Sequence, residues 1–399
     1  MGPSVYVAGI GVISGIGNNV AEHLHAFEQE AHGMAAVTHF NTIHQNDYPV
    51  AEVKLNNDEL AELAHLPGNY SRTTLLSLIA AREALDDAGI PGLENLRAGF
   101  ISANTVGGMD KSEDFFANFL ADNNKGKLRD VYDHECGSMT EIVADQLGLT
   151  DFMTTISTAC SSSANSIMYG ARLIKNDALD VVVAGGTDAL TKFTLNGFST
   201  LMILDKQLCR PFDETREGLN LGEGAGYLVL VSEKVMNTLN KDPYCLISGY
   251  KNSNDAYHQT ASSPDGTGSY LAMKGALTKS GLQPSDIDYI NLHGTGTPNN
   301  DSSEGIAIKR IFDPHYPPVS STKSYTGHTL GASGGIEAVF SVLAVKHGLV
   351  FSNLRFETQM NEVTFAPETR FLTGQDIRHV MSNSFGFGGN CTSLIFSGV

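Results

Sequence analysis

Cys160 is the first residue whose surroundings favour chemistry. It stands in TTISTACSSSANSIMYGARLI, after a β-prone run and before a segment of helical periodicity. A thiol at such a strand-to-helix turn faces unpaired backbone amides and the positive end of the helix dipole, which favour a thiolate and supply an oxyanion hole. The sequence therefore predicts a nucleophile, with a buried structural cysteine as the alternative reading.

His293 is the second candidate. It ends the half-apolar run DIDYINLH, and the hydroxyl-rich loop GTGT follows it. A histidine placed there can reach into a cleft, and Thr295 and Thr297 can hydrogen-bond an amide-bearing ligand. A lone histidine at the end of a strand is often only structural, but the GTGT loop favours the functional reading.

A second imidazole occurs in KSYTGHTLGASGGIEAVF, which contains Lys323, His328 and Glu337. Two imidazoles beside a thiol would form a nucleophile with two hydrogen-bond donors. The stretch GASGG has neither the GxxxxGK[ST] order nor the GxGxxG spacing, so we expect no nucleotide site.

The last candidate is the loop NSFGFGGN, where Phe385 and Phe387 alternate with glycines. Such a loop can move, and it can direct backbone amides and one aromatic ring at a neighbour. A glycine-rich bulge before the final strand is the alternative. Each of the four segments is ambiguous when taken alone.

Strands alternating with helices must position these residues. Apolar β-branched runs end in small residues at VYVAGIGVI, AGFISANT, VVVAGGTDAL, YLVLV, CLISGY, YINLHGTGT and SLIFSGV. Helix-period segments lie between several of them, which predicts an α/β protein with crossover units and largely buried sheets. A polar stretch closed by Pro243 is the best candidate boundary, and CLISGYKNSNDA faintly echoes VYVAGIGVISGIGNN.

Composition excludes several classes of function. The chain of 399 residues has 26 Lys plus Arg against 44 Asp plus Glu, a formal charge of -18, which argues against nucleic acid and anionic membrane surfaces as partners. The five cysteines are scattered without zinc-ligand spacing, so we expect neither a disulfide framework nor a metal. No apolar run approaches the ~20 residues of a membrane span, and the first residues read as a strand rather than a signal peptide, so we expect the cytoplasm.

The motifs are specific when taken together. The order TACSSS, HGTGT, KSYTGH, NSFGFGG, with RPFDETREGLNLGEGAG and NDAYHQTASSPDG, closely resembles the β-ketoacyl-acyl-carrier-protein synthases, within them the elongating type I/II group and type II more than type I. The resemblance covers essentially the whole chain. It implies the α/β thiolase-like fold, in which two duplicated halves with mixed five-stranded sheets form an αβαβα layered sandwich. The halves would be residues 1–244, with the nucleophile, and 245–399, with both histidines, and a homodimer is expected.

The resemblance also implies a reaction. Cys160 would take the acyl chain from an acyl carrier protein thioester. His293 and His328 would then bind the carbonyl oxygen of malonyl-carrier protein, and loss of carbon dioxide would leave an enolate that attacks the acyl-Cys160 thioester. No cofactor is expected to be bound, because phosphopantetheine arrives on the carrier protein.

Supporting roles follow from the same resemblance. The backbone amides of Cys160 and Phe385 would hold the oxyanion of the acyl thioester, and Phe385 would gate the pocket. Lys323 and Glu337 would form a charged pair that orders the site and tunes His328.

Substrate contacts are implied as well. Thr295 and Thr297 match the contacts to the phosphopantetheine arm, whereas Val106, Phe198 and Met109 fall where the family lines its acyl tunnel. The chain departs from the family in the short stretch LMILDKQLCRPFD and at Asp188, where Glu is frequent. The acyl length therefore stays open, as does the choice between fatty-acid elongation and a polyene or polyketide pathway.

Two other functions are possible. A catalytically silent chain-length partner of a ketosynthase heterodimer would keep the fold without the nucleophile, but Cys160 and both histidines are present. A starter-condensing synthase or a thiolase would use coenzyme A thioesters, and His328 in TGH argues against both.

An acyl carrier protein is strongly acidic, so its docking on a chain of charge -18 requires a local basic patch. The best candidates are Lys125, Lys127 and Arg129 in NNKGKLRD, together with Arg72. A solvated charged loop is the alternative for this cluster.

Overall fold

The structure is a computed structural model and describes residues 3–399. Ten strands within these residues form one mixed sheet in the order β3-β2-β4-β5-β1-β6-β10-β9-β7-β8. The strands are β1 (Val5–Ser14), β2 (Ala98–Ala103), β3 (Phe152–Ile156), β4 (Val181–Asp188), β5 (Gly224–Ser232), β6 (Cys245–Asn254), β7 (Tyr289–Asn291), β8 (Val319–Ser320), β9 (His379–Gly386) and β10 (Asn390–Ser397).

The strand order repeats. The first half of the sheet has the order β3-β2-β4-β5-β1, and the second half, counted from its outer edge, has the equivalent order β8-β7-β9-β10-β6. The halves join where β1 pairs with β6 through Tyr6 with Leu246 and Val7 with Cys245. The two predicted five-stranded sheets are thus continuous through one short contact. This repeat is the duplication expected of the thiolase-like fold, while the division of the chain after residue 244 stays a prediction.

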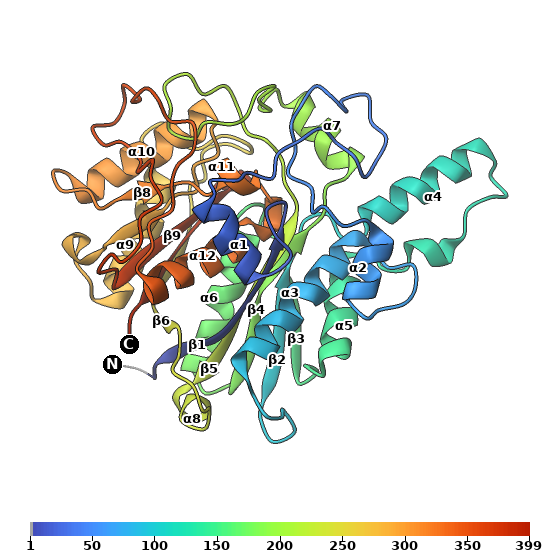
Figure 1. The fold of residues 1–399 in the computed structure, drawn as a ribbon, viewed down its shortest axis with the longest axis horizontal. Coiled ribbons are helices and arrows are strands. Elements are labelled where there is room, and N and C mark those ends of the chain that lie inside the picture. Colours follow the sequence, from blue (N-terminus) through green and yellow to red (C-terminus); the bar gives the residue numbers. More distant parts are fainter. Residues whose placement is uncertain (1–2) are drawn as a thin grey trace.

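Helices form three layers around the two halves of the sheet (Figure 1). The main helices are α1 (Val20–Glu28), α2 (Asn57–Leu63), α3 (Arg72–Ala88), α4 (Met109–Ala121), α5 (Cys136–Leu147), α6 (Ser162–Lys175), α7 (Lys192–Thr200), α9 (Thr267–Ser280), α10 (Pro298–Phe312) and α12 (Ser333–His347), with the short α8 (Glu233–Met236) and α11 (Lys323–Thr326). Helices α6 and α12 lie between the halves, α3 covers the outer face of the first, and α9 covers that of the second. The layered α/β prediction is confirmed.

Helix α12 is buried in the central layer. Every residue from Ser333 to Ala344 is buried, because both faces of this helix meet a sheet. Its backbone lies so close to β5 that a Cβ on Gly226 would stand 2.5 Å from the amide nitrogen of Ile336. Glycine is therefore required at this crossing.

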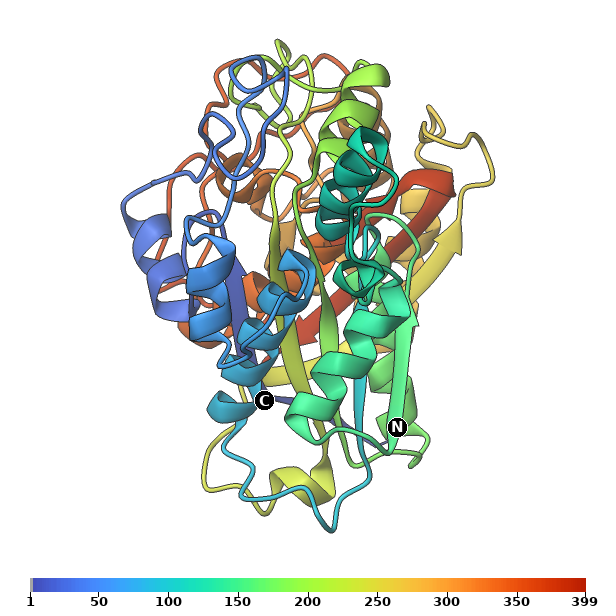
Figure 2. The same ribbon diagram turned by 90° about the vertical axis from the view of Figure 1, so that its right-hand side faces the viewer.

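Helix α4 is exceptional because it projects from the body of the molecule (Figures 1 and 2). None of its residues is buried. Among residues 3–399, no helix is both long and apolar enough to cross a membrane.

Candidate active site

Cys160, His293 and His328 meet in one buried place. The Cys160 sulfur and a ring nitrogen of each histidine lie within 4.8 Å of one another. The connection from β3 to α6 brings Cys160, the turn after β7 brings His293, and the turn between α11 and α12 brings His328. They line a cavity of about 350 Å³.

The nucleophile stands on a sharp turn. Ala159 has a left-handed backbone (φ 54°), and helix α6 begins two residues after Cys160, at Ser162. The hydroxyl of Ser162 accepts a hydrogen bond from the amide of Thr158 (2.8 Å) and donates one to the carbonyl of Ala159 (2.5 Å). These bonds hold a conformation that is strained for a non-glycine residue, and they fix the position of the thiol.

Burial disfavours the charged form of the Cys160 thiol. Burial raises the pKa of Cys160 to about 11, although the Lys323 charge and the backbone amides of Phe387 and of Cys160 itself act in the opposite direction. Desolvation, the largest influence on this pKa, opposes the predicted thiolate in the resting state. The amides directed at the sulfur can still hold an oxyanion when the thiol attacks a carbonyl.

Both imidazoles present an N–H to the cavity. The Lys323 ammonium, which can only donate, lies 3.2 Å from Nδ1 of His293, and the Leu330 amide donates to Nδ1 of His328 at 3.0 Å. Each Nδ1 is thus an acceptor, so each proton is on Nε2. The pKa of both rings is well below the ordinary value because of burial and the Lys323 charge, so two neutral N–H donors point into the site.

A buried ion pair supports the histidines. Lys323 bonds to Glu337 of α12, and both side chains are almost fully buried. Burial raises the pKa of Glu337 to about 7 against the influence of Lys323. The predicted pair forms, but its direct contact is with His293, and it acts on His328 only through charge.

Two carboxylates outside the predicted set of site residues shape the GTGT loop. Glu304 accepts hydrogen bonds from the amides of His293 (3.0 Å) and Gly294 (2.8 Å), and Asp301 accepts one from the amide of Thr295 (3.0 Å). The loop is closed by a hydrogen bond between the hydroxyls of Thr295 and Thr297 (2.9 Å). The available signal was the i, i+3 acidic pair in NNDSSEG, which presents both carboxylates on one face of α10.

The backbone amide next to Cys160 lies two residues further along the glycine-rich loop than predicted. Phe385 lines the cavity and its ring lies 5.9 Å from that of His293, but its backbone belongs to β9 and pairs with Cys391. The amide that approaches Cys160 belongs to Phe387, which follows the end of the strand. We therefore correct the amide donor from Phe385 to Phe387. The Phe387 ring stacks on Phe198 at 5.9 Å, and both rings line the cavity.

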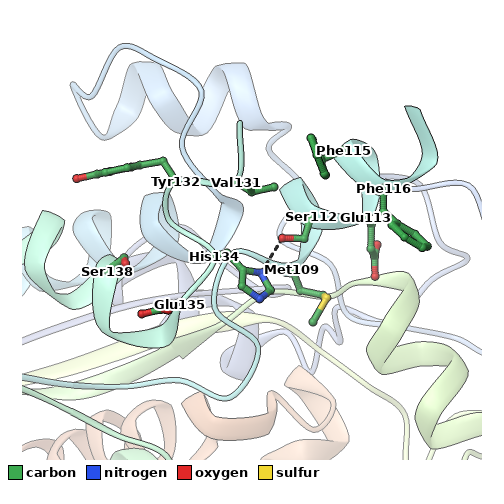
Figure 3. A pocket seen from close by; sticks show the side chains of 10 residues that line it. All are labelled: Met109, Ser112, Glu113, Phe115, Phe116, Val131, Tyr132, His134, Glu135 and Ser138. Carbon is green, nitrogen blue, oxygen red and sulfur yellow. Dashed lines mark hydrogen bonds between the residues drawn. The ribbon is translucent and has the colours of Figure 1, made fainter. Parts of the chain in front are cut away.

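The predicted acyl wall is one apolar cluster. Val106, Met109 and Phe198 pack together with buried Leu195, and Phe198 also lines the catalytic cavity. Met109 continues into a second cavity of about 580 Å³ at the foot of α4 (Figure 3). Its lining is mixed: apolar side chains from α4 stand beside Glu113, Glu135 and the hydrogen-bonded pair Ser112 and His134 (2.6 Å).

The predicted docking residues separate into two groups. Lys125, Lys127 and Arg129 are exposed in the loop after α4. Arg72 is buried, and its guanidinium binds both carboxylate oxygens of Glu223 at 2.7–2.9 Å. The prediction that Arg72 contacts a carrier protein is wrong, because this side chain is used inside the fold.

A buried thiol that faces two imidazole donors defines a site for acyl transfer through a thioester. Residues 4–235 match the family model of the beta-ketoacyl synthase N-terminal domain, and residues 244–357 match that of the C-terminal domain. The chain belongs to the β-ketoacyl synthase family.

Named relatives and solved structures support this family assignment. The chain is 34% identical to 3-oxoacyl-[acyl-carrier-protein] synthase 2 of Staphylococcus aureus (strain COL), over 98% of this chain and 97% of that protein. It is 33% identical to a putative mitochondrial 3-oxoacyl-[acyl-carrier-protein] synthase of Schizosaccharomyces pombe, over 98% of each. Among solved structures, the ishigamide ketosynthase/chain length factor superposes with a TM-score of 0.94 at 29% identity, over the whole of both chains. A beta-ketoacyl synthase from Burkholderia phymatum superposes with a TM-score of 0.88 at 26% identity, also over both whole chains.

Proposed function

We propose that this chain catalyses the decarboxylative Claisen condensation of malonyl-acyl carrier protein with an acyl group carried on Cys160. The observation that carries the proposal is the convergence of the Cys160 thiol with two imidazole Nε2–H donors in one cavity. A thiol gives a transferable thioester, and two neutral donors match an oxygen that gains negative charge.

In the first half-reaction the Cys160 sulfur attacks the carbonyl carbon of acyl-carrier protein. The amides of Cys160 and Phe387 stabilise the oxyanion, and the thiol proton leaves with the phosphopantetheine thiolate. Because the pKa of Cys160 is raised to about 11, proton loss must accompany the attack. The Phe387 ring, stacked on Phe198, has to move for the acyl chain to reach the apolar wall.

In the second half-reaction malonyl-carrier protein loses carbon dioxide, and the electron pair forms an enolate. The Nε2–H groups of His293 and His328 stabilise its oxygen. The enolate carbon attacks the acyl-Cys160 carbonyl, the carbon–sulfur bond breaks, and the Cys160 thiolate takes a proton from solvent. The hydroxyls of Thr295 and Thr297 at the cavity wall are the proposed contacts of the phosphopantetheine arm, which the carrier protein brings; no resident cofactor is needed.

The alternative is a silent chain-length subunit. Two similar solved structures are complexes of a ketosynthase with a chain length factor, the ishigamide pair and ApeO with ApeC from Xenorhabdus doucetiae. Such a subunit would lack the nucleophile, whereas here Cys160 is present and oriented. This favours the condensing role.

Replacement of Cys160 tests the function directly. With acyl-carrier protein, the wild type should gain the mass of the acyl group, and Cys160→Ala should neither gain it nor condense. Cys136→Ala, at a half-buried cysteine outside the catalytic cavity, is the matched control and should behave as wild type. Acylation or condensation by Cys160→Ala would contradict the assignment.

A second copy of the chain is the proposed partner of α4. This helix projects from the body and exposes Phe116 (57%), Phe119 (42%) and Leu120 (69%). Light scattering should find a homodimer, and Leu120→Asp should weaken it. Leu271→Asp, at an exposed leucine (45%) on α9, should not. A wild-type monomer, or a dimer that forms only with a different chain, would refute the proposal.

Carrier-protein docking is proposed at Lys125, Lys127 and Arg129, because these cations are exposed on one loop. The double change Lys127→Glu with Arg129→Glu should raise the KM for carrier protein and leave kcat unchanged. The exposed control Lys346→Glu should leave both KM and kcat unchanged. An unchanged KM would remove the loop from consideration.

The cytoplasm is the proposed compartment, because five free cysteines, one of them the nucleophile, suit a reducing environment.

A further inference from the structure

Asp188 is a buried carboxylate at the end of β4 that the reaction above does not use. It accepts hydrogen bonds from the amide of Thr105 (2.9 Å), the hydroxyl of Thr105 (2.6 Å), the amide of Val106 (3.1 Å) and the amide of Gly331 (2.7 Å). Within residues 3–399, no Lys or Arg lies at ion-pair distance from it. Four polar hydrogens therefore replace the water that this carboxylate loses on burial.

The four donors come from two sides of the active site. Thr105 and Val106 lead from β2 into the apolar acyl wall. Gly331 directly follows Leu330, whose amide donates to Nδ1 of His328 at 3.0 Å and so keeps the proton on Nε2. The Ser333 hydroxyl is the second group near this nitrogen, at 3.2 Å, but unlike the amide it can either donate or accept. One carboxylate thus connects the acyl wall to the turn that orients a proposed decarboxylation donor.

The contact to Gly331 is tight. A Cβ on Gly331 would stand 2.7 Å from Oδ2 of Asp188, so the carboxylate touches the backbone of this turn directly. Leu330 itself has a left-handed backbone (φ 54°). Leu330 lies between His328 and the amide of Gly331 that Asp188 binds. Because the Leu330 backbone is strained, we infer that the Asp188 contact is needed to keep the Leu330 amide directed at His328.

We propose that Asp188 is a positioning residue for decarboxylation, which orients His328 through the Leu330–Gly331 turn and at the same time sets the place of Val106 in the acyl wall. The proposal rests on the proposed function of the site. It predicts that Asp188 affects the second half-reaction much more than the acylation of Cys160, because Cys160 is held by other hydrogen bonds.

Asp188→Asn is the most direct test, because the side chain keeps its size. One carboxylate oxygen is replaced by an NH₂ group, which would face the N–H and O–H donors that now bind Asp188. We expect the rate of carbon dioxide release from malonyl-carrier protein to fall by about tenfold or more, and acylation of Cys160 by a short acyl donor to stay within about twofold. The matched control is Thr105→Val, which removes one bond on the wall side only. Its decarboxylation rate should stay within about twofold of wild type, while its acyl-length preference shifts.

The tautomer of His328 provides a readout that loss of stability alone would not change. In ¹⁵N spectra of histidine-labelled protein, assigned by comparison with His328→Ala, wild-type His328 should show a single Nε2–H tautomer and Asp188→Asn a mixture. If Asp188→Asn does not fold, Asp188→Glu takes its place. It keeps the charge, but its extra methylene group must displace the carboxylate from the fully buried contact with Gly331, so the same changes are expected at smaller size.

Two results would overturn the proposal: an unchanged His328 tautomer, or an equal loss of acylation and decarboxylation in the substituted enzyme. Failure of the proposed function is distinguishable. Wild-type protein that neither acylates Cys160 nor decarboxylates malonyl-carrier protein would refute the condensation, while the His328 tautomer would still report on Asp188.

Discussion

Replacement of His293 by alanine should separate the two half-reactions. His293 supplies one of two Nε2–H donors, and its proton position is set by Lys323 at 3.2 Å. The acyl oxyanion, in contrast, is held by backbone amides that this substitution leaves in place. The change should therefore slow decarboxylation and spare acylation of Cys160.

The size of the effect follows from this geometry. Loss of one preorganised donor to a developing oxyanion costs ~2.7–4 kcal/mol, a rate loss of roughly 10²–10³-fold, provided that the second donor stays in place. The amide of Leu330 holds His328 independently of His293, so that condition is met. His293→Gln, which can return an N–H donor, should recover part of the loss.

Two measurements on the same preparation check this result. Carbon dioxide release from malonyl-carrier protein reports decarboxylation, and intact mass with acyl-carrier protein reports the acylation of Cys160. His347→Ala, at an exposed histidine at the end of α12, is the control and should match wild type. The reasoning fails if decarboxylation falls by less than about tenfold, or if acylation falls by the same factor.

Three further changes test other parts of the structure. Gly386→Ala should slow acylation of Cys160 by about tenfold or more, because its Cβ would stand 3.0 Å from the backbone nitrogen of Cys160; a normal mass gain at a normal rate would contradict this contact. Arg72→Ala should lower the free energy of unfolding by ~3–5 kcal/mol, since it leaves Glu223 buried without its partner, and denaturant titration would show this. His23→Gln should lose stability at pH 7 but less in acid. Burial lowers the pKa of His23 to about 4, so the wild type loses stability as pH falls from 6.5 towards 4, and the gap between the two proteins should narrow by about 2.5 kcal/mol by pH 4.5. A gap that does not change with pH would show that His23 is not the buried neutral group.

Sequence patterns predicted the features that depend on residues close together in the chain. The alternation of apolar runs and helix-period segments predicted the layered fold, and the residue types around Cys160, His293 and His328 indicated the chemistry. These features can be predicted because a strand that ends in glycine and is followed by a helix is typical of the loops where α/β folds place their active sites.

Features that depend on distant contacts were not predictable in the same way. Arg72 was taken for a surface cation, since nothing local shows that Glu223, which is 151 positions away, lies beside it. The raised pKa of the Cys160 thiol also depends on burial that the whole fold creates. The choice between Phe385 and Phe387 required the last residue of β9, and strand ends are poorly marked in a glycine-rich run.

The repeated topology explains why the site forms between the halves. Strands β2, β3 and β4 correspond to β7, β8 and β9, and the site residues follow the carboxyl ends of these strands in both halves. The turn after β3 carries Cys160, and the connection after its counterpart β8 carries Lys323 and His328. The turn after β7 carries His293, while its counterpart after β2 carries the acyl wall at Val106.

Equivalent positions have thus acquired complementary tasks. Strand β4 ends in Asp188, which binds the turn at Val106 and the turn after His328. Its counterpart β9 ends just before Phe387, whose amide approaches the nucleophile. Neither half contains both a nucleophile and the donors that the reaction needs. Because β1 and β6 pair over only two residues, the central helices α6 and α12 must hold the halves in register. The packing of these two helices is therefore a condition of catalysis as well as of stability.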